Sequence, residues 1–140
     1  RDRVEPDRLA LVDEAIETTA NNTALNLSIC FNYGARGEIT KAARRLATEV
    51  AAGRLMPDDI SIDVMGAALD TDGIPDPDLL IRTSGELRLS NFLLWQLAYT
   101  EFVFLEAYWP DFNKDMLVQA IESYRERSRR FGGLATRSTG

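Results

Sequence analysis

Histidine is absent from this 140-residue chain, and cysteine occurs only once, at Cys30. Without histidine, the chain itself cannot form Ser-His-Asp triads, use histidine for acid–base catalysis or bind a metal through histidine. A single cysteine allows no internal disulfide, which favours a reducing compartment. No apolar run approaches the roughly 20 residues that cross a membrane as a helix.

The chain also has no excess of basic over acidic residues, because its formal net charge is −6 and its isoelectric point is near 4.7. A general nucleic-acid-binding protein usually has a basic surface, so we expect no nucleic-acid partner. Hydrophobic residues make up 45% and charged residues 27%, a mixture that allows a real core. The length suits one domain or one large piece of a larger domain.

The periodicity of apolar residues alternates along the chain between two patterns. Helical spacing and start signals indicate helices, and short apolar runs between turn residues indicate buried strands. The expected helices begin at Pro6, Glu38, Pro57, Asn91 and Lys114, and the expected strands cover 24–31, 79–81 and 102–105. This alternation predicts an α/β fold with a mostly parallel central sheet flanked by helices.

Polar residues interrupt two apolar runs in the stretch "DLLIRTSGELRLSNFLLWQLAYTEFVF", residues 78–104. Arg82 directly follows the expected strand, where ligands of parallel sheets collect. Arg88 and Ser90 come just before the expected helix, whose N–H groups and dipole favour an anion. Arginine makes bidentate, charge-assisted bonds to phosphate oxygens. The stretch therefore predicts a phosphate or pyrophosphate site.

Each residue of this stretch also has an ordinary structural interpretation. Arg82 could be a salt-bridge partner, Glu86 could pair with either arginine, and Ser90 could be a helix N-cap. Glu101 follows the expected helix and could be a surface carboxylate. Residue patterns alone predict an α/β domain with a phosphate-type anion site, and no more.

The whole stretch resembles the cis-prenyltransferases, the family of undecaprenyl diphosphate synthase. "FNYGAR" precedes it, and "WPDF" and "RRFGG" follow in the family's order, so the resemblance runs from about Arg3 to Gly133. It implies a prenyltransferase that condenses isopentenyl diphosphate onto an allylic diphosphate such as farnesyl diphosphate. The new double bond would have Z stereochemistry, Mg²⁺ would be the cofactor, and the product would serve as a cell-wall lipid carrier.

The resemblance also assigns roles to individual residues. Arg82, Arg88 and Ser90 match the residues that hold the pyrophosphate of isopentenyl diphosphate, and Glu101 matches the Mg²⁺ partner. The family's C-terminal Arg-x-Gly element reaches the active site of the other subunit in a homodimer, and its residues here are Arg130 and Gly132. Leu25 matches a position near the floor of the product tunnel, although the sequence alone favours an ordinary core leucine.

The family's "MDGNxRW"-type loop, which carries the catalytic Asp, does not occur in this chain, and the first residue is Arg1. We therefore expect residues 1–133 to be the C-terminal part of one catalytic domain, followed by a flexible tail at 134–140. The chain would hold the isopentenyl diphosphate half-site and no catalytic residue of its own.

Two other interpretations remain open. The chain could be a non-catalytic partner subunit or inactive fragment of a cis-prenyltransferase. It could also be a phosphate-binding module of low selectivity. The family further implies delivery of a long product to the membrane, with the enzyme cytoplasmic or peripheral.

Overall fold

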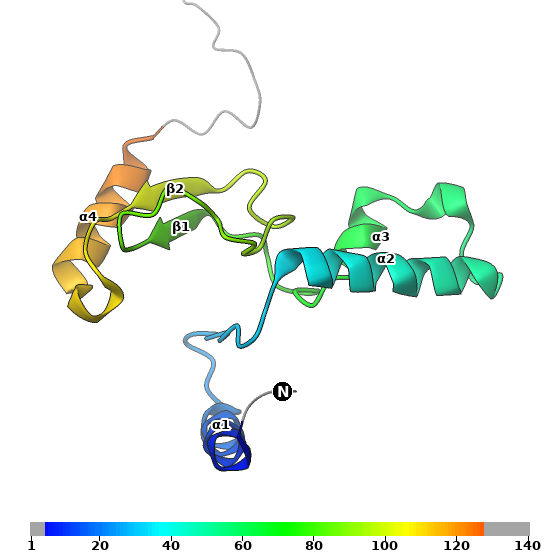
Figure 1. Ribbon diagram of the computed structural model, residues 1–140, viewed down its shortest axis with the longest axis horizontal. Helices are drawn as coiled ribbons and strands as arrows, with labels where there is room; N and C mark the ends of the chain where they lie inside the picture. The colour runs from blue at the N-terminus through cyan, green and yellow to red at the C-terminus, as the bar shows by residue number, and fades with distance from the viewer. Residues whose placement is uncertain (1–4, 128–140) are drawn as a thin grey trace, which may run out of the picture. The chain divides into compact units, whose positions relative to one another are not determined.

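The computed structural model describes residues 5–127, and the chain divides into two compact units, residues 1–34 and 35–140 (Figure 1). The predicted tail at 134–140 lies outside the described residues, as do Arg130 and Gly132. The first unit contains helix α1, Pro6–Thr19, which begins where the sequence predicts. Its apolar repeat is exposed within the described residues, as Val12 and Ile16 show with 45% and 54% of their surface accessible.

The buried strand predicted at 24–31 is wrong for the described structure, which assigns no strand there. Alternate residues of this segment are apolar, yet all four are between 67% and 78% exposed: Leu25, Leu27, Ile29 and Phe31. An apolar/polar alternation specifies only which face a strand would bury. A strand forms when a neighbour pairs its backbone N–H and C=O groups, and the described part of this unit supplies none.

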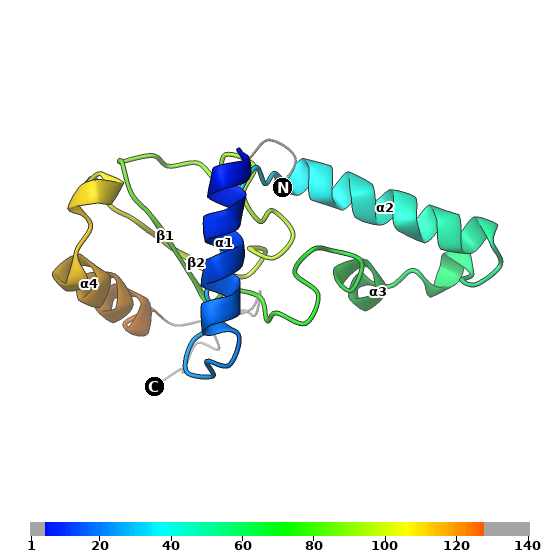
Figure 2. The same cartoon turned by 90° about the horizontal axis from the view of Figure 1, so that it is seen from below.

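The second unit begins with helix α2, Ala35–Ala51, followed by a 3-10 turn at Pro57–Asp59 and the short helix α3, Ile62–Gly66. Helix α2 confirms the helix predicted from Glu38, with a start three residues earlier. α2 and α3 lie side by side (Figures 1 and 2). Their buried cluster consists of Ala42, Leu46, Ala68 and Leu69, and Trp95 packs against it.

The same unit contains two parallel strands, β1 at Leu79–Arg82 and β2 at Glu101–Phe104. Leu79 pairs with Glu101, and Arg82 pairs with Phe104. A 3-10 turn at Trp109–Asp111 leads to helix α4, Lys114–Arg125, which packs beside β2 (Figures 1 and 2). Parallel strands flanked by helices confirm the α/β class, and both strands of the stretch 78–104 lie where the sequence predicts them.

The helix predicted at 91–99 is wrong, because these residues form successive turns. Ser90, Asn91 and Leu93 all have positive φ angles, of 48°, 66° and 43°. A right-handed helix requires negative φ at every residue, so left-handed residues at its start prevent it from forming there. Part of this apolar segment still turns inward, since Leu97 is 4% exposed, whereas Tyr99 is 69% exposed.

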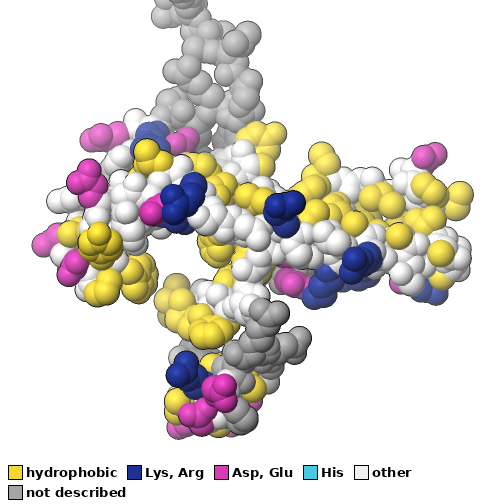
Figure 3. Space-filling model, viewed as in Figure 1, with side chains coloured by type: hydrophobic (Ala, Val, Ile, Leu, Met, Phe, Trp, Pro, Cys, Tyr) yellow, Lys and Arg dark blue, Asp and Glu magenta, His cyan; other side chains and the backbone are white. Residues whose placement is uncertain are grey.

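No helix in the described part of the chain is long and apolar enough to cross a membrane. On the face shown in Figure 3, a few Lys and Arg side chains gather along α2, and other basic side chains stand singly among acidic and hydrophobic ones. That face shows no continuous basic surface, in agreement with the net negative charge.

Candidate anion site at the end of β1

The backbone beyond β1 remains attached to the segment that follows β2. Leu105 donates its N–H to the Arg82 carbonyl at 2.8 Å, and Gly85 donates to the Leu105 carbonyl at 2.9 Å. Ser84 donates to the Ala107 carbonyl at 2.8 Å. Ser84 and Gly85 reverse the chain with positive φ angles of 73° and 65°. Arg82 therefore projects from a firmly hydrogen-bonded strand end.

Arg82 and Ser90, predicted to act together, do lie together. The Arg82 Nη2 atom is 3.5 Å from the Ser90 Oγ atom, although eight residues separate them in the sequence. The Arg82 Nε atom is buried and has no hydrogen-bond partner among the described residues. A buried N–H donor without an acceptor is costly, so one left open requires an explanation. A bound anion would supply the missing acceptor.

Arg88 makes an ion pair with Glu86, as one of the ordinary interpretations allows. The Arg88 side chain is 68% exposed, and the Glu86 side chain is 33% exposed. A pair this exposed contributes little to stability, and a guanidinium has five N–H donors, more than one carboxylate occupies. Arg88 can therefore release Glu86 for an anion at small cost.

Glu101 lies at the opposite end of the strand pair from Arg82. Glu101 is the first residue of β2 and pairs with Leu79, whereas Arg82 pairs with Phe104. Three residues of strand, about 10 Å, therefore separate Glu101 from Arg82 along the strands. The Glu101 Oε2 atom accepts a hydrogen bond from Arg127 Nη1 at 3.1 Å, and the same nitrogen donates to the Phe102 carbonyl at 2.8 Å. Glu101 is therefore not part of the Arg82–Ser90 group within one chain.

The described residues contain no cluster of three or more acidic, cysteine or histidine side chains that could hold a metal ion. Mg²⁺ in phosphate-binding enzymes commonly takes only one or two carboxylates, with phosphate oxygens and water completing the shell. Glu101 could supply one such carboxylate, and phosphate oxygens and water would have to supply the other ligands. Arg127 would have to yield its contact when a cation binds.

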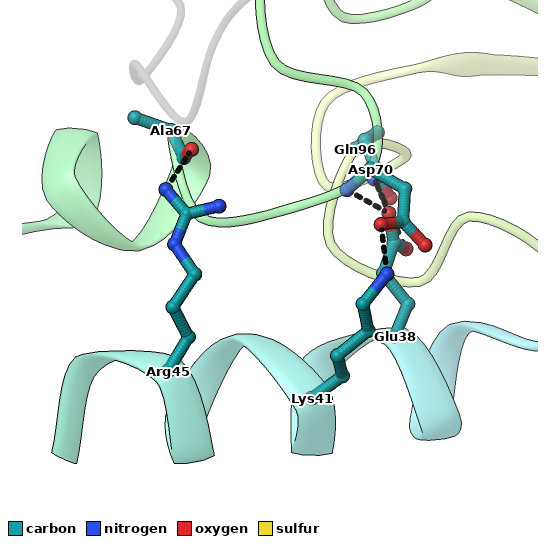
Figure 4. Close-up of polar contacts among 6 residues, drawn as sticks. All are labelled: Glu38, Lys41, Arg45, Ala67, Asp70 and Gln96. Carbon is teal, nitrogen blue, oxygen red and sulfur yellow. Dashed lines mark hydrogen bonds and ion pairs between the residues drawn. The ribbon is translucent and has the colours of Figure 1, made fainter. Parts of the chain in front are cut away.

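The sequence prediction missed a polar connection between α2 and the segment after Ser90. The Glu38 side chain, 4% exposed, accepts the Asp70 N–H at 2.9 Å and lies 3.3–3.4 Å from Gln96 Nε2 (Figure 4). Gln96 is 3% exposed and also donates to Thr71 Oγ1 at 2.9 Å. Residues 38 and 96 are far apart in sequence, and the only signal was a glutamate in an otherwise apolar helical stripe.

The same face of α2 carries two further links to the chain after α3 (Figure 4). Lys41 Nζ lies 2.7 Å from Asp70 Oδ1, and Arg45 Nη2 donates to the Ala67 carbonyl at 3.2 Å. These contacts are exposed and supplement the buried Glu38 group rather than replace it.

Asn91 is a second residue whose role the sequence prediction missed. Its backbone carbonyl accepts the Ala35 N–H at 2.8 Å, and its Oδ1 atom accepts the Arg36 N–H at 2.8 Å. The sequence offers Ser90 or Asn91 as a cap for a helix directly after them. Asn91 instead caps α2, more than fifty residues earlier in the chain.

Leu25 is 78% exposed and lies in the irregular segment of the first unit. Its interpretation as a core leucine is therefore wrong for the described structure. The tunnel role of Leu25 and the roles of Arg130 and Gly132 stay predictions.

The family model for putative undecaprenyl diphosphate synthase matches residues 1–132. The chain belongs to this family, the cis-prenyltransferases. The isoprenyl transferase of Brucella suis is 59% identical over 133 residues, which are 95% of this chain and 52% of that protein. The isoprenyl transferase of Rhizobium meliloti is 57% identical over 96% of this chain and 54% of its own length. The chain thus spans about half the length of these relatives.

Solved structures agree with this assignment. Lavandulyl diphosphate synthase from Lavandula x intermedia, in complex with dimethylallyl diphosphate, matches with a TM-score of 0.88 and 41% identity, over 94% of this chain and 56% of that one. A probable undecaprenyl diphosphate synthase from Campylobacter jejuni matches with a TM-score of 0.75 and 34% identity, over 94% and 59% of the two chains.

Proposed function

We propose that this chain carries the isopentenyl diphosphate half-site of a cis-prenyltransferase, with Arg82, Arg88 and Ser90 as the groups that hold the diphosphate. The open Arg82 Nε donor is the observation that carries this proposal. The guanidinium that carries this donor lies beside the Ser90 hydroxyl and near the end of a parallel strand, where ligands of such sheets bind. Membership of the family supports the same ligand.

The proposed reaction makes one carbon–carbon bond and breaks one carbon–oxygen bond. The diphosphate group of the allylic substrate leaves with the electron pair of the C–O bond, and the isopentenyl double bond attacks the allylic carbon. Loss of a proton then restores a double bond, in the Z configuration. Arg82, Arg88 and Ser90 act by holding isopentenyl diphosphate in place for this attack, so their contribution is positional.

Several further features of the whole enzyme belong to this proposal. Mg²⁺ would offset the negative charge that develops on the leaving diphosphate of the allylic substrate, with Glu101 as one ligand. The allylic substrate, such as farnesyl diphosphate, would bind through parts of the enzyme that this chain does not supply. A homodimer would bring Arg130 and Gly132 to the partner's site, and Leu25 would border the product tunnel.

The same proposal covers the setting of the reaction. The enzyme would be cytoplasmic or peripheral at a membrane, and its long product would enter the lipid phase as a carrier for cell-wall synthesis. The aromatic residues Tyr108 and Trp109, each at least 67% exposed, would be available for contact with a second chain.

The direct test incubates the chain with labelled isopentenyl diphosphate, farnesyl diphosphate and Mg²⁺ and separates the extracted products by length. We expect no product from the chain alone, but saturable binding of isopentenyl diphosphate. The same measurement of isopentenyl diphosphate binding, made without Mg²⁺ and with Glu101→Gln, tests whether Mg²⁺ and Glu101 contribute to that binding. A series of prenyl diphosphates of increasing length would confirm the activity. It would also show that this chain needs no other part of the enzyme to bind the allylic substrate. Neither product nor binding would refute the proposal.

Glu86→Gln is expected to strengthen isopentenyl diphosphate binding about threefold. The substitution removes a carboxylate that competes for Arg88 and repels an anion, and exposed charge pairs of this kind are worth up to about 1 kcal/mol. Titration calorimetry measures the change, with Glu122→Gln as a control because it removes a carboxylate from another exposed arginine pair. Weaker binding by Glu86→Gln would mean that Glu86 orients Arg88 rather than competing for it.

A further inference from the structure

The turn that carries Ser90 is joined to the first residues of α2 by Asn91. Two hydrogen bonds of 2.8 Å make this join, one to the Asn91 carbonyl and one to its Oδ1 atom. The two acceptors take the N–H groups of Ala35 and Arg36, which have no carbonyl partner within the helix itself. Asn91 thus accepts the first two backbone N–H groups of the 17-residue helix α2, and it is the residue next to Ser90 in the chain.

This join is needed because the turn has a backbone conformation that its residues do not favour. Ser90, Asn91 and Leu93 have positive φ angles, and only asparagine among them adopts such angles readily. A turn of this kind keeps its shape when surrounding contacts hold it. Farther along, Trp95 and Gln96 anchor the segment to the α2–α3 cluster and to Glu38. Asn91 is the anchor adjacent to Ser90.

We propose that Asn91 is a positioning residue, which fixes the Ser90 hydroxyl beside Arg82 through its hold on the start of α2. The inference rests on the proposed function, because it concerns the same diphosphate site. Asn91 itself need not touch the ligand. Its contribution is to keep Oγ of Ser90 within reach of Arg82 Nη2, so that both groups meet one anion.

Asn91→Gly tests this inference with little disturbance of the backbone. Glycine retains the carbonyl that accepts the Ala35 N–H and adopts a positive φ without strain, so only the Oδ1 acceptor is lost. Asn113→Gly is the matched control. Asn113 Oδ1 caps α4 by accepting the N–H groups of Asp115 and Met116, and it lies outside the proposed site.

Titration calorimetry with isopentenyl diphosphate should show about tenfold weaker binding by Asn91→Gly, in the range of one hydrogen bond to a charged group. Asn113→Gly should bind like the unsubstituted chain. In a Ser90→Ala background, Asn91→Gly should cause little further loss, because the group that it positions is gone. Full additivity of the two substitutions, or equal weakening by Asn113→Gly, would overturn the positioning role.

Hydrogen exchange of the unsubstituted chain gives a second measurement that needs no variant to fold. If Asn91 couples the site to α2, isopentenyl diphosphate should slow exchange of the Arg36 amide, since coupling between sites is reciprocal. Binding without any change at Arg36 overturns the inference alone. An unsubstituted chain that binds no isopentenyl diphosphate overturns the proposed function, and this inference with it.

Discussion

Replacing Arg82 with alanine is expected to weaken isopentenyl diphosphate binding about 100-fold or more. The substitution removes the open Nε donor and the guanidinium beside Ser90 Oγ, and each hydrogen bond to a charged partner contributes about 1.5–3 kcal/mol. Equilibrium binding of labelled isopentenyl diphosphate measures the effect. Arg82→Lys should recover only part of the affinity, because an ammonium retains the charge but not the forked donor geometry.

Arg45→Ala provides the control for Arg82→Ala. Arg45 is also an arginine, its Nη2 atom donates to the Ala67 carbonyl, and it lies on α2 away from the strand end. Its loss should leave binding unchanged. If Arg82→Ala also leaves binding unchanged, the chain behaves as a non-catalytic partner or binds its ligand elsewhere, and the proposed half-site is wrong.

Glu38→Ala is expected to lower the free energy of unfolding by about 2–4 kcal/mol. The substitution leaves the Asp70 N–H and the Gln96 amide, both held by the buried carboxylate, without their acceptor. A loss of this size corresponds to a fall in melting temperature of roughly 10 °C for a domain of this length. Thermal unfolding followed by circular dichroism measures it.

Glu49→Ala is the matched control, because Glu49 is on the same helix but pairs with Arg54 near the surface. The Arg54 hydrogen bond, at 2.6 Å from Nε, lowers the pKa of the Glu49 carboxyl and raises the pKa of Arg54. The pair therefore stabilises the fold above the usual pKa of glutamate, and this contribution is lost as the pH falls through the lowered pKa. Near neutral pH, Glu49→Ala should change the melting temperature much less than Glu38→Ala. Equal effects would show that Glu38 is not a buried anchor.

The elements that the sequence predicted well are those specified by local signals. β1, α2 and α4 combine apolar periodicity with turn or cap residues, such as Asn113 at the start of α4. The pairing of Arg82 with Ser90 was also predictable, because it depends on a strand end and a short turn. The family motifs pointed to the same residues.

The errors arose where the structure depends on distant residues. The segment 91–99 has the apolar content of a helix, but the Asn91 side chain caps the start of α2 by accepting the Arg36 N–H. Ser90, Asn91 and Leu93 also have positive φ angles, which a right-handed helix does not allow. The segment 24–31 has the alternation of a strand without a described partner. The network of Glu38, Thr71 and Gln96 joins three separate parts of the chain, and a single sequence gives no measure of such contacts.

The ligand selectivity of the unsubstituted chain tests the central claim most directly. Calorimetry should compare isopentenyl diphosphate with inorganic pyrophosphate and inorganic phosphate under one set of conditions. The account predicts saturable binding of one isopentenyl diphosphate per chain, weaker binding of pyrophosphate and little binding of phosphate. Equal affinity for all three would indicate an unselective phosphate-binding module, and no binding of any would contradict the anion site at Arg82 altogether.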